Sequence, residues 1–255
     1  MNLSNVLLDL IYGAAIGFAL GLTGGGGSII TLPVLVYLIG ESVHEAIGTS
    51  LVVVGGIAAQ GFLAQRTNVR FGSGLIVGLL GVIGNIPGSI LAGHVSGELL
   101  LLLFAGFMFV SAFAMLFIRL PDHVEGAKPH WLMVAVVGAV LGFLTGFLGV
   151  GGGFLIVPAL VFALGFSMRN AIATSLFVIF VNTVVALGSR FGHAPVAWFV
   201  ALLLFAGGFA GNALGAKLAK SLDHRLLKTI FAVFVMAVGA FTGLSALHII
   251  PINVK

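Results

Sequence analysis

Ten apolar runs, separated by short stretches that hold Gly, Pro or charged residues, occupy almost the whole chain. We predict a helix for each, because continuous apolar runs of this length are typical of membrane-embedded helices. The runs cover residues 6–22, 28–40, 44–64, 72–93, 98–118, 131–148, 153–166, 169–189, 195–216 and 224–247. Eight of them approach or exceed the roughly 17 to 25 residues that cross the hydrocarbon core, whereas 28–40 and 153–166 are too short to cross comfortably.

A repeat relates the two halves of the chain. Residues 17–51 align without a gap on residues 142–176, and 16 of the 35 aligned positions are identical. The matched polar, Gly and Pro positions include Gly24/Gly149, Gly26/Gly151, Gly27/Gly152, Pro33/Pro158, Thr49/Thr174, Ser50/Ser175 and, farther along, Asn85/Asn212. Shared hydrophobicity does not explain such matches. We therefore expect two homologous membrane units, residues 1–120 and 131–255, joined by a loop at 121–130.

Each half holds five runs, so the second half should enter the membrane from the opposite side, as in inverted-repeat transporters. The loop charges favour this orientation, because alternating sides put nine Lys and Arg residues on one face and two on the other. The nine are Arg66, Arg70, Arg119, Lys128, Arg169, Lys217, Lys220, Arg225 and Lys228, and the two are Arg190 and Lys255. By the positive-inside rule, both termini are expected outside. Ten crossings, or six crossings with two re-entrant hairpins, give the same sidedness, and both stay open.

The composition excludes a water-soluble protein. Of 255 residues, 60% are hydrophobic and 7% are charged, and the mean hydropathy is +1.26, whereas about 25% of residues are charged in ordinary soluble domains. The chain is therefore predicted to be an all-α integral membrane protein. Its net charge of +4 lies in loops and forms no patch, so we expect no nucleic-acid partner. The first residues lack the positive region of a secretory signal, so we expect no cleaved leader.

Residues with catalytic or metal-binding chemistry are scarce. There is no cysteine, and the seven histidines lie at run ends or in loops without the spacing of a metal site. No Ser, His and carboxylate gather at one membrane depth. We therefore predict no enzyme activity, no catalytic residue, no metal and no cofactor. No charged residue stands in the middle of a run, so the carboxylate relay of a proton-driven pump is not visible.

The candidate site lies at two glycine clusters that precede the two short runs. Helix breaks at matching positions of two halves are the best sequence indication of a transporter's binding site. The helix starts that follow would point unpaired N–H groups into the membrane interior, which favours an anion. The alternative is that these glycines only allow close helix packing, the role we favour for Gly13/Gly17/Gly21 and Gly138/Gly142/Gly146. The predicted site residues here are Gly24, Gly26, Gly27, Ser28, Gly149, Gly151, Gly152 and Gly153.

Matched polar residues in the longer runs complete the predicted site. They are Thr49, Ser50, Thr174, Ser175, Asn85 and Asn212. The hydroxyls could face the same cavity, or could bond back to a preceding carbonyl of their own helix. For the two asparagines, whose amides need a partner in hydrocarbon, we favour a structural bond to another helix over a ligand contact. Gln60 and Asn182 are weaker candidates of the same kind.

The repeated motifs resemble those of a known family. GLTGGGGSIITLP with AIGTSL, and GFLGVGGGFLIVP with AIATSL, resemble the sulfite exporter TauE/SafE family of membrane permeases, also called the 4-toluene sulfonate uptake permease family. Val150 interrupts the second glycine cluster, and Ser28 is replaced by Gly153 in the second half, so the ligand contacts of the two halves need not be equivalent.

The resemblance implies a transporter of small sulfur-containing or organic anions, such as sulfite, sulfoacetate or another organosulfonate, in a bacterial inner membrane. We hypothesise alternating access, in which the halves rock about a central site. The expected partners are the anionic substrate, the lipid bilayer and a coupling ion, either a proton or sodium. The rival hypothesis is a passive channel or facilitator for a small neutral solute. Neither residues nor motifs indicate an oligomeric state.

Overall fold

The computed structural model describes residues 3–92, 94–95, 97–117, 130–148, 153–189 and 196–246. In these residues the chain is helical almost throughout and forms no strand, which confirms the all-α prediction. The helices are α1 Leu3–Thr23, α2 Gly26–Pro33, α3 Val43–Ala64, α4 Phe71–Ala92, α5 Gly97–Phe117, α6 Trp131–Leu148, α7 Gly153–Phe162, α8 Met168–Ser189, α9 Trp198–Ser221 and α10 His224–Ala246. The predicted loop at 121–130 falls almost entirely outside the described residues, and the division into two units stays a prediction.

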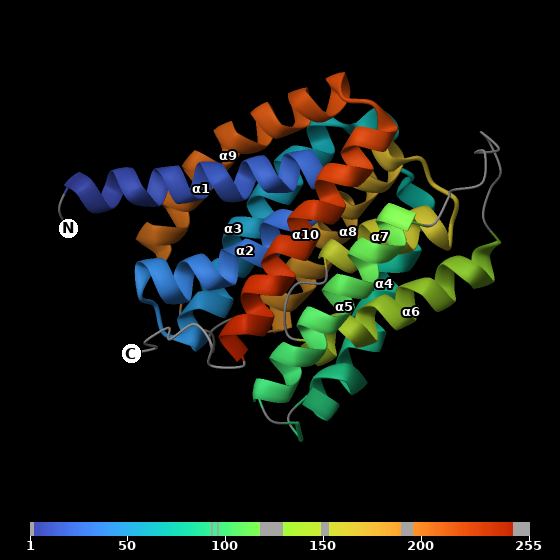
Figure 1. The fold of residues 1–255 in the computed structure, drawn as a ribbon, viewed down its shortest axis with the longest axis horizontal. Helices are drawn as coiled ribbons and strands as arrows, with labels where there is room; N and C mark the ends of the chain where they lie inside the picture. The colour runs from blue at the N-terminus through green and yellow to red at the C-terminus, as the bar shows by residue number, and fades with distance from the viewer. Residues whose placement is uncertain are drawn as a thin grey trace.

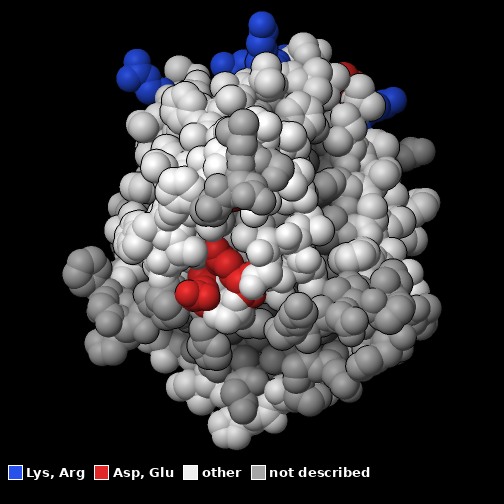
Figure 2. Space-filling view, turned by 90° about the vertical axis from the view of Figure 1, so that its left-hand side faces the viewer, with Lys and Arg blue, Asp and Glu red and all other residues white. Residues whose placement is uncertain are grey.

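Several helices match the thickness of a bilayer. The spans Asn5–Thr23, Phe71–Gly88, Met168–Leu187, Trp198–Ser221 and Arg225–Leu244 are long and apolar enough to cross a membrane. Apolar side chains such as Ile11, Ile83 and Trp198 are exposed on the outer surface, where lipid would cover them. Figure 2 shows few charged side chains on the face that it draws, with Lys and Arg along its upper edge. These features identify a membrane protein.

The two short helices end in the same way. A π-helical segment, Val34–Ile39, continues α2, and Gly40 then adopts a φ of 85°; Gly165, after α7, adopts a φ of 66°. Each left-handed glycine lets the next N–H turn back onto the helix, from Glu41 to the Leu35 carbonyl at 2.9 Å and from Phe166 to the Leu160 carbonyl at 3.0 Å. The seventh run was predicted to be helical to residue 166, but α7 ends at Phe162 because of this turn.

Helices of one half pack mainly against helices of the other half. The most extensive contacts join α1 to α9, α4 to α6, α5 to α10 and α3 to α8. In Figure 1, α9 lies beside α1 along the upper side of the molecule, and α4 and α6 lie together at the lower right. Exchanging the two halves turns the α1–α9 pair into the α6–α4 pair, so the contacts agree with a two-fold relation between the halves. Their inverted orientation in a membrane stays a prediction.

Glycines bring the long helix pairs into main-chain contact. A Cβ on Gly17 of α1 would overlap the main chain of Gly208 of α9, and a Cβ on Gly142 of α6 would overlap that of Gly81 of α4. The other glycines of the two predicted stripes also face the partner helix: Gly13, Gly21, Gly138 and Gly146. The predicted packing role of these stripes is therefore confirmed. Such contacts are the usual way in which helices associate inside lipid, where apolar burial gives no driving force.

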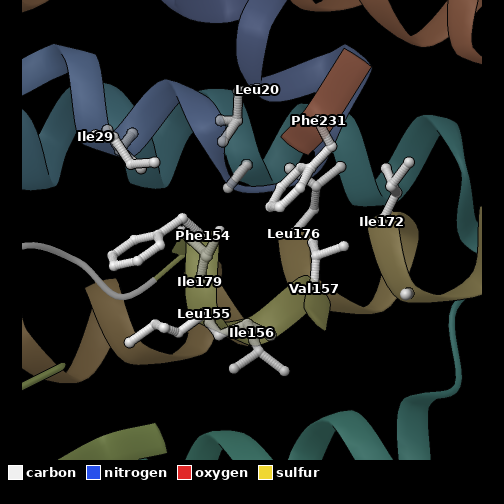
Figure 3. Close-up of a cluster of buried hydrophobic side chains, with 14 of the residues drawn as sticks. Leu20, Ile29, Phe154, Leu155, Ile156, Val157, Ile172, Leu176, Ile179 and Phe231 are labelled. Atoms are coloured by element: carbon white, nitrogen blue, oxygen red, sulfur yellow. The ribbon is translucent and has the colours of Figure 1, made fainter. Parts of the chain in front are cut away.

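Apolar side chains surround the short helices at the centre. Figure 3 shows the side chains of α7 among those of α1, α2, α8 and α10. Every residue of α7 from Phe154 to Pro158 is buried, and the Phe154 ring meets that of Phe104 of α5 at 5.2 Å with the planes almost perpendicular. A ten-residue helix this deeply enclosed has its position fixed by both halves.

We predict opposite effects for two glycine-to-alanine substitutions. Gly17→Ala should lower the free energy of unfolding by about 1 to 3 kcal/mol, because its methyl group is forced into the main chain of α9. Gly106→Ala, on an exposed face of α5 with open space around it, should raise stability by up to about 1 kcal/mol through helix propensity. Thermal unfolding of the purified protein in detergent measures both. Equal stability of the two variants would contradict the packing assignment.

Candidate functional site

The two glycine segments meet inside the molecule. Gly25 precedes α2 and Gly153 begins α7, and a Cβ on Gly25 would overlap the Gly153 carbonyl group. From the other side, a Cβ on Gly153 would lie 2.7 Å from the Ser28 hydroxyl and 2.9 Å from the Gly25 carbonyl oxygen. The starts of the two short helices are therefore in direct contact, as the repeat predicts for a shared site.

Ser175 links the first glycine segment to the second half of the chain. Gly24 has a φ of 73°, which favours glycine, and its N–H donates to the Leu20 carbonyl at 2.7 Å. The Ser175 hydroxyl lies 2.7 Å from the Gly24 carbonyl oxygen and 2.8 Å from that of Ile172, so its proton is shared between them. This hydroxyl therefore bonds back to its own helix and also reaches the glycine segment of the other half, and its contact with a substrate stays a prediction.

Hydroxyls also organise the start of α2. Thr23 accepts a hydrogen bond from the Gly26 N–H at 2.8 Å and donates to the Ala19 carbonyl at 2.6 Å. Ser28 donates to the Gly25 carbonyl at 2.8 Å. Gly27 and Ser28 lie in the first turn, whose N–H groups have no acceptor within their own helix. Thr23 is buried, and the sequence analysis did not identify it, because Leu148 takes its place in the second half.

The matched threonines make matched bonds between the halves. Thr49 of α3 accepts from the Ala197 N–H, at the start of α9, at 3.1 Å. Thr174 of α8 accepts from the Arg70 N–H, just before α4, at 3.0 Å. Each threonine therefore caps the fourth helix of the other half, where first-turn N–H groups lack partners. Thr49 and Thr174 act at least in part as structural residues.

The two asparagines differ. Asn212 of α9 is buried, and its side-chain N–H₂ group donates to the Ile57 carbonyl at 3.3 Å and to Gln60 Oε1, both on α3. Its own oxygen has no partner among the described residues. The predicted interhelical bond is therefore present at Asn212. Asn85 of α4 is half-buried and contacts Gly146 of α6 through its main chain.

The predicted site residues fall into two groups. Gly24, Ser28, Gly153 and Ser175 gather at the junction of the short helices, whereas Gly26 faces Phe234 of α10 and Gly27 packs on Ile16 and Leu20 of α1. Thr49, Thr174, Asn85 and Asn212 lie at contacts between long helices, and Ser50 is half-buried beside Thr49. Gly149, Gly151 and Gly152 lie outside the described residues. The junction is thus the part of the predicted site that the structure brings together.

Comparison with known proteins places the chain in a family. The sulfite exporter TauE/SafE family model matches residues 10–242. The chain belongs to this family. It is 34% identical over 252 residues to a probable membrane transporter protein of Xylella fastidiosa, with 94% of this chain and 96% of the relative covered. It is 29% identical to the probable membrane transporter protein YunE of Bacillus subtilis, over 92% of this chain and 94% of that one. The protein is therefore a membrane transporter, and its family is not an enzyme family.

Acidic residues form a second polar feature of this TauE/SafE protein, which the sequence analysis missed. Figure 2 shows Asp and Glu side chains in a hollow of the surface, apart from the Lys and Arg side chains. Glu41, after the π-helical segment, is affected by the charges of two other acids, Glu45 and Asp9. Burial raises the pKa of Glu41, the Thr49 hydroxyl lowers it, and the charges of Glu45 and Asp9 raise it further.

Two apolar grooves flank the short helices. A groove of about 360 Å³ lies between α2 and α10 and is lined by Pro33, Tyr37 and Phe234, among others. The other groove, of about 350 Å³, lies between α5, α6 and α7 and is lined by Pro158 and Phe107, among others. Their apolar walls suit lipid or hydrocarbon and offer little to a small anion.

Ser175→Ala should destabilise the junction. The substitution leaves the Gly24 carbonyl without its donor, so we expect a loss of about 1 to 3 kcal/mol in the free energy of unfolding. Ser221→Ala is the matched control, because its hydroxyl donates to the Leu218 carbonyl on an exposed surface, and its effect should stay within about 0.5 kcal/mol. Thermal unfolding in detergent compares them. If both variants unfolded at the wild-type temperature, the Ser175 hydrogen bond would not contribute to stability.

Proposed function

We propose that this protein carries small sulfur-containing or organic anions, such as sulfite, sulfoacetate or another organosulfonate, across a bacterial inner membrane by alternating access. The observation that carries the proposal is the contact between Gly25 and Gly153, which brings the starts of two short helices together. Broken helices inside a membrane protein are tolerated where their main chain is buried in protein or lines a water-filled cavity. The family supplies the transport function and a sulfur oxyanion as the first substrate to test.

The chemistry of the junction favours an anion. The first-turn N–H groups of α2 and α7 carry the positive ends of the helix dipoles. The hydroxyl protons of Ser28 and Ser175 are donated to main-chain carbonyls, so the donors left for a ligand are first-turn N–H groups, and no carboxylate among the described residues is bonded to the junction. An oxyanion that enters would exchange part of its hydration for these N–H groups, as anions do at helix starts. The substrate-binding residues in this proposal are those predicted from the sequence.

The contacts between the halves support a rocking motion. α2 and α7 belong to different halves and touch at the site, and Thr49 and Thr174 each bond across to the other half. A rotation of one half against the other would open the junction first on one side and then on the other. In this proposal the halves have inverted orientation, both termini are extracytoplasmic, and transport is coupled to a proton or sodium.

A transport assay tests the function. Purified protein in proteoliposomes should show saturable counterflow of at least one anion from a panel of sulfite, sulfoacetate, alkanesulfonates and carboxylates. Gly26→Leu should abolish it, because even a Cβ at Gly26 lies 2.6 Å from both the Phe234 ring and the Thr23 hydroxyl. Gly151→Leu is predicted from the repeat to have the same effect.

Gly72→Leu is the control for this assay, because Gly72 is exposed near the start of α4 with open space around it. It should keep wild-type counterflow. All variants must elute as monodisperse protein before they are compared. Full activity of folded Gly26→Leu protein would exclude the junction as the site, and non-saturable flux of neutral solutes without anion dependence would favour the channel hypothesis.

Single cysteines test the orientation, since the natural chain has none. Cysteines placed at residues 2 and 254 should react with an impermeant thiol reagent added outside intact cells. Cysteines at residues 68 and 220 should react only after the membrane is permeabilised, because the loop charges predict that these loops are cytoplasmic. The reverse pattern would overturn the proposed orientation without affecting the substrate assignment.

A further inference from the structure

Asp9 is a buried acid inside an apolar helix. It lies in the second turn of α1 and is 5% exposed, whereas its neighbours Leu7, Leu8 and Ile11 are exposed. Its side chain is therefore on the inward face of α1. No hydrogen bond or ion pair to Asp9 is present within the described part of the chain. A carboxylate enclosed in this way is costly in its charged form and is a functional candidate by default.

Glu41 faces Asp9 from another element. The left-handed turn at Gly40 fixes the Glu41 main chain, and both carboxylate oxygens are buried without a hydrogen-bond partner of good geometry among the described residues. Figure 2 shows Asp and Glu side chains together in one hollow of the surface, and the Asp9 charge is among those that act on Glu41. Glu45 is the third acid, but it is partly engaged at the start of α3, where it accepts from the Ser42 hydroxyl at 3.2 Å. The buried Asp9 and the carboxylate of the half-buried Glu41 thus share one polar hollow.

Within the described part of the chain, neither a metal site nor an ion pair explains these acids. No three His, Asp or Glu side chains of the described residues are arranged to hold a metal ion. Among the described residues, the titratable groups that act on Glu41 are Asp9 from α1 and Glu45 from α3, both acidic, and from the start of α9 the described contact is the uncharged Ala197 N–H on Thr49. Two carboxyl groups held together without a cation are stabilised when one of them binds a proton.

The acids are also not required by the repeated architecture. The repeat offset of 125 places Val134, Phe166 and Asn170 in the second half where Asp9, Glu41 and Glu45 stand in the first. Val134 and Phe166 are buried in the core, so the same positions are filled there by apolar side chains. The first half therefore carries an energetic cost that the second half avoids, as expected of a functional group.

We propose that Asp9 and Glu41 form a proton-binding site that couples proton movement to anion transport. This inference rests on the proposed function, since it assumes that an anion is carried. When both acids are charged, they repel an anion that approaches Thr49 and the junction beyond it. When one proton is bound, the repulsion falls, so proton and anion favour each other's binding and should travel together.

The Thr49 hydroxyl connects this site to the other half of the chain, which moves relative to the first half in the proposed mechanism. It stabilises the charged form of Glu41, and its oxygen accepts the Ala197 N–H of the other half. Protonation of Glu41 removes the charge from one side of Thr49 while the contact to α9 stays on the other side. Proton binding in the first half thereby alters a contact between the halves, which alternating access requires of a coupling site. One proton moving with one monovalent anion transfers no net charge.

The test uses the full chain in proteoliposomes with methanesulfonate, which stays ionised and so does not cross lipid as a neutral acid. Counterflow without a pH gradient reports anion transport itself. Net uptake with an imposed inward proton gradient, at zero membrane potential, reports coupling. Wild-type protein should accumulate the anion by up to about tenfold per pH unit for one proton per anion. Adding methanesulfonate outside weakly buffered vesicles should also make the medium more alkaline.

Glu41→Gln and Asp9→Asn should keep counterflow and lose gradient-driven accumulation, and either folded variant suffices for the test. Asp223→Asn, in the turn between α9 and α10, should keep both activities. If wild-type counterflow persists but uptake ignores the proton gradient or follows sodium instead, the proposal is wrong while the proposed function stands. If folded Glu41→Gln and Asp9→Asn accumulate the anion like the wild type, coupling does not use these acids. Absence of wild-type counterflow for every anion in the panel would overturn both proposals.

Discussion

Main-chain polar groups inside a bilayer must find partners within the protein, and this constraint governs the centre of the structure. Two helices are broken there, at Gly24 and before Gly153, which frees N–H and C=O groups where water and lipid offer no simple replacement. Side-chain hydroxyls supply partners at the described positions: Thr23 for the Gly26 N–H and Ser175 for the Gly24 carbonyl. A break that is satisfied in this way can be retained at membrane depth, and in the proposed function the first-turn N–H groups that remain bind the anion.

The same constraint explains why the halves are interleaved. Ser175 reaches Gly24 from the other half, Thr49 and Thr174 cap helices of the other half, and the glycine stripes of α1 and α6 lie on α9 and α4. In lipid, helices associate through such close contacts and polar bonds, and apolar burial contributes little. Each half therefore provides hydrogen-bond partners and packing surfaces for helices of the other half. A rearrangement of one half must change contacts at the junction, and this makes the junction the natural place to link motion with ligand binding.

The sequence predicted the helices and the junction because the signals there are local or repeated. Runs of apolar residues mark helices, and the match of Gly24–Ser28 with Gly149–Gly153 marks the break. It did not predict the partners of Asn212, because these depend on which helix lies opposite. Asn212 bonds to Ile57 and Gln60, whereas the repeat places Asn182 and Val185 at those positions, so the two asparagines have different surroundings. Asp9 was missed for a similar reason: an acid near the end of an apolar run looks like an interface residue until the packing around it is known.

The differences between the halves matter as much as their likeness. If two inverted repeats were identical in sequence, the inward-open and outward-open arrangements would be equivalent, and nothing in the protein would favour one over the other. A bias must therefore come from positions where the repeat fails, and Asp9/Val134, Glu41/Phe166 and Glu45/Asn170 are such positions in one cluster. Because the free energy of charged carboxyl groups depends on whether water reaches them, the proposed protonation would change the relative stability of the two arrangements. A change of about 1.4 kcal/mol would shift their ratio tenfold. In the proposed mechanism, the residues that differ between the two halves therefore determine the direction of transport and its coupling to protons.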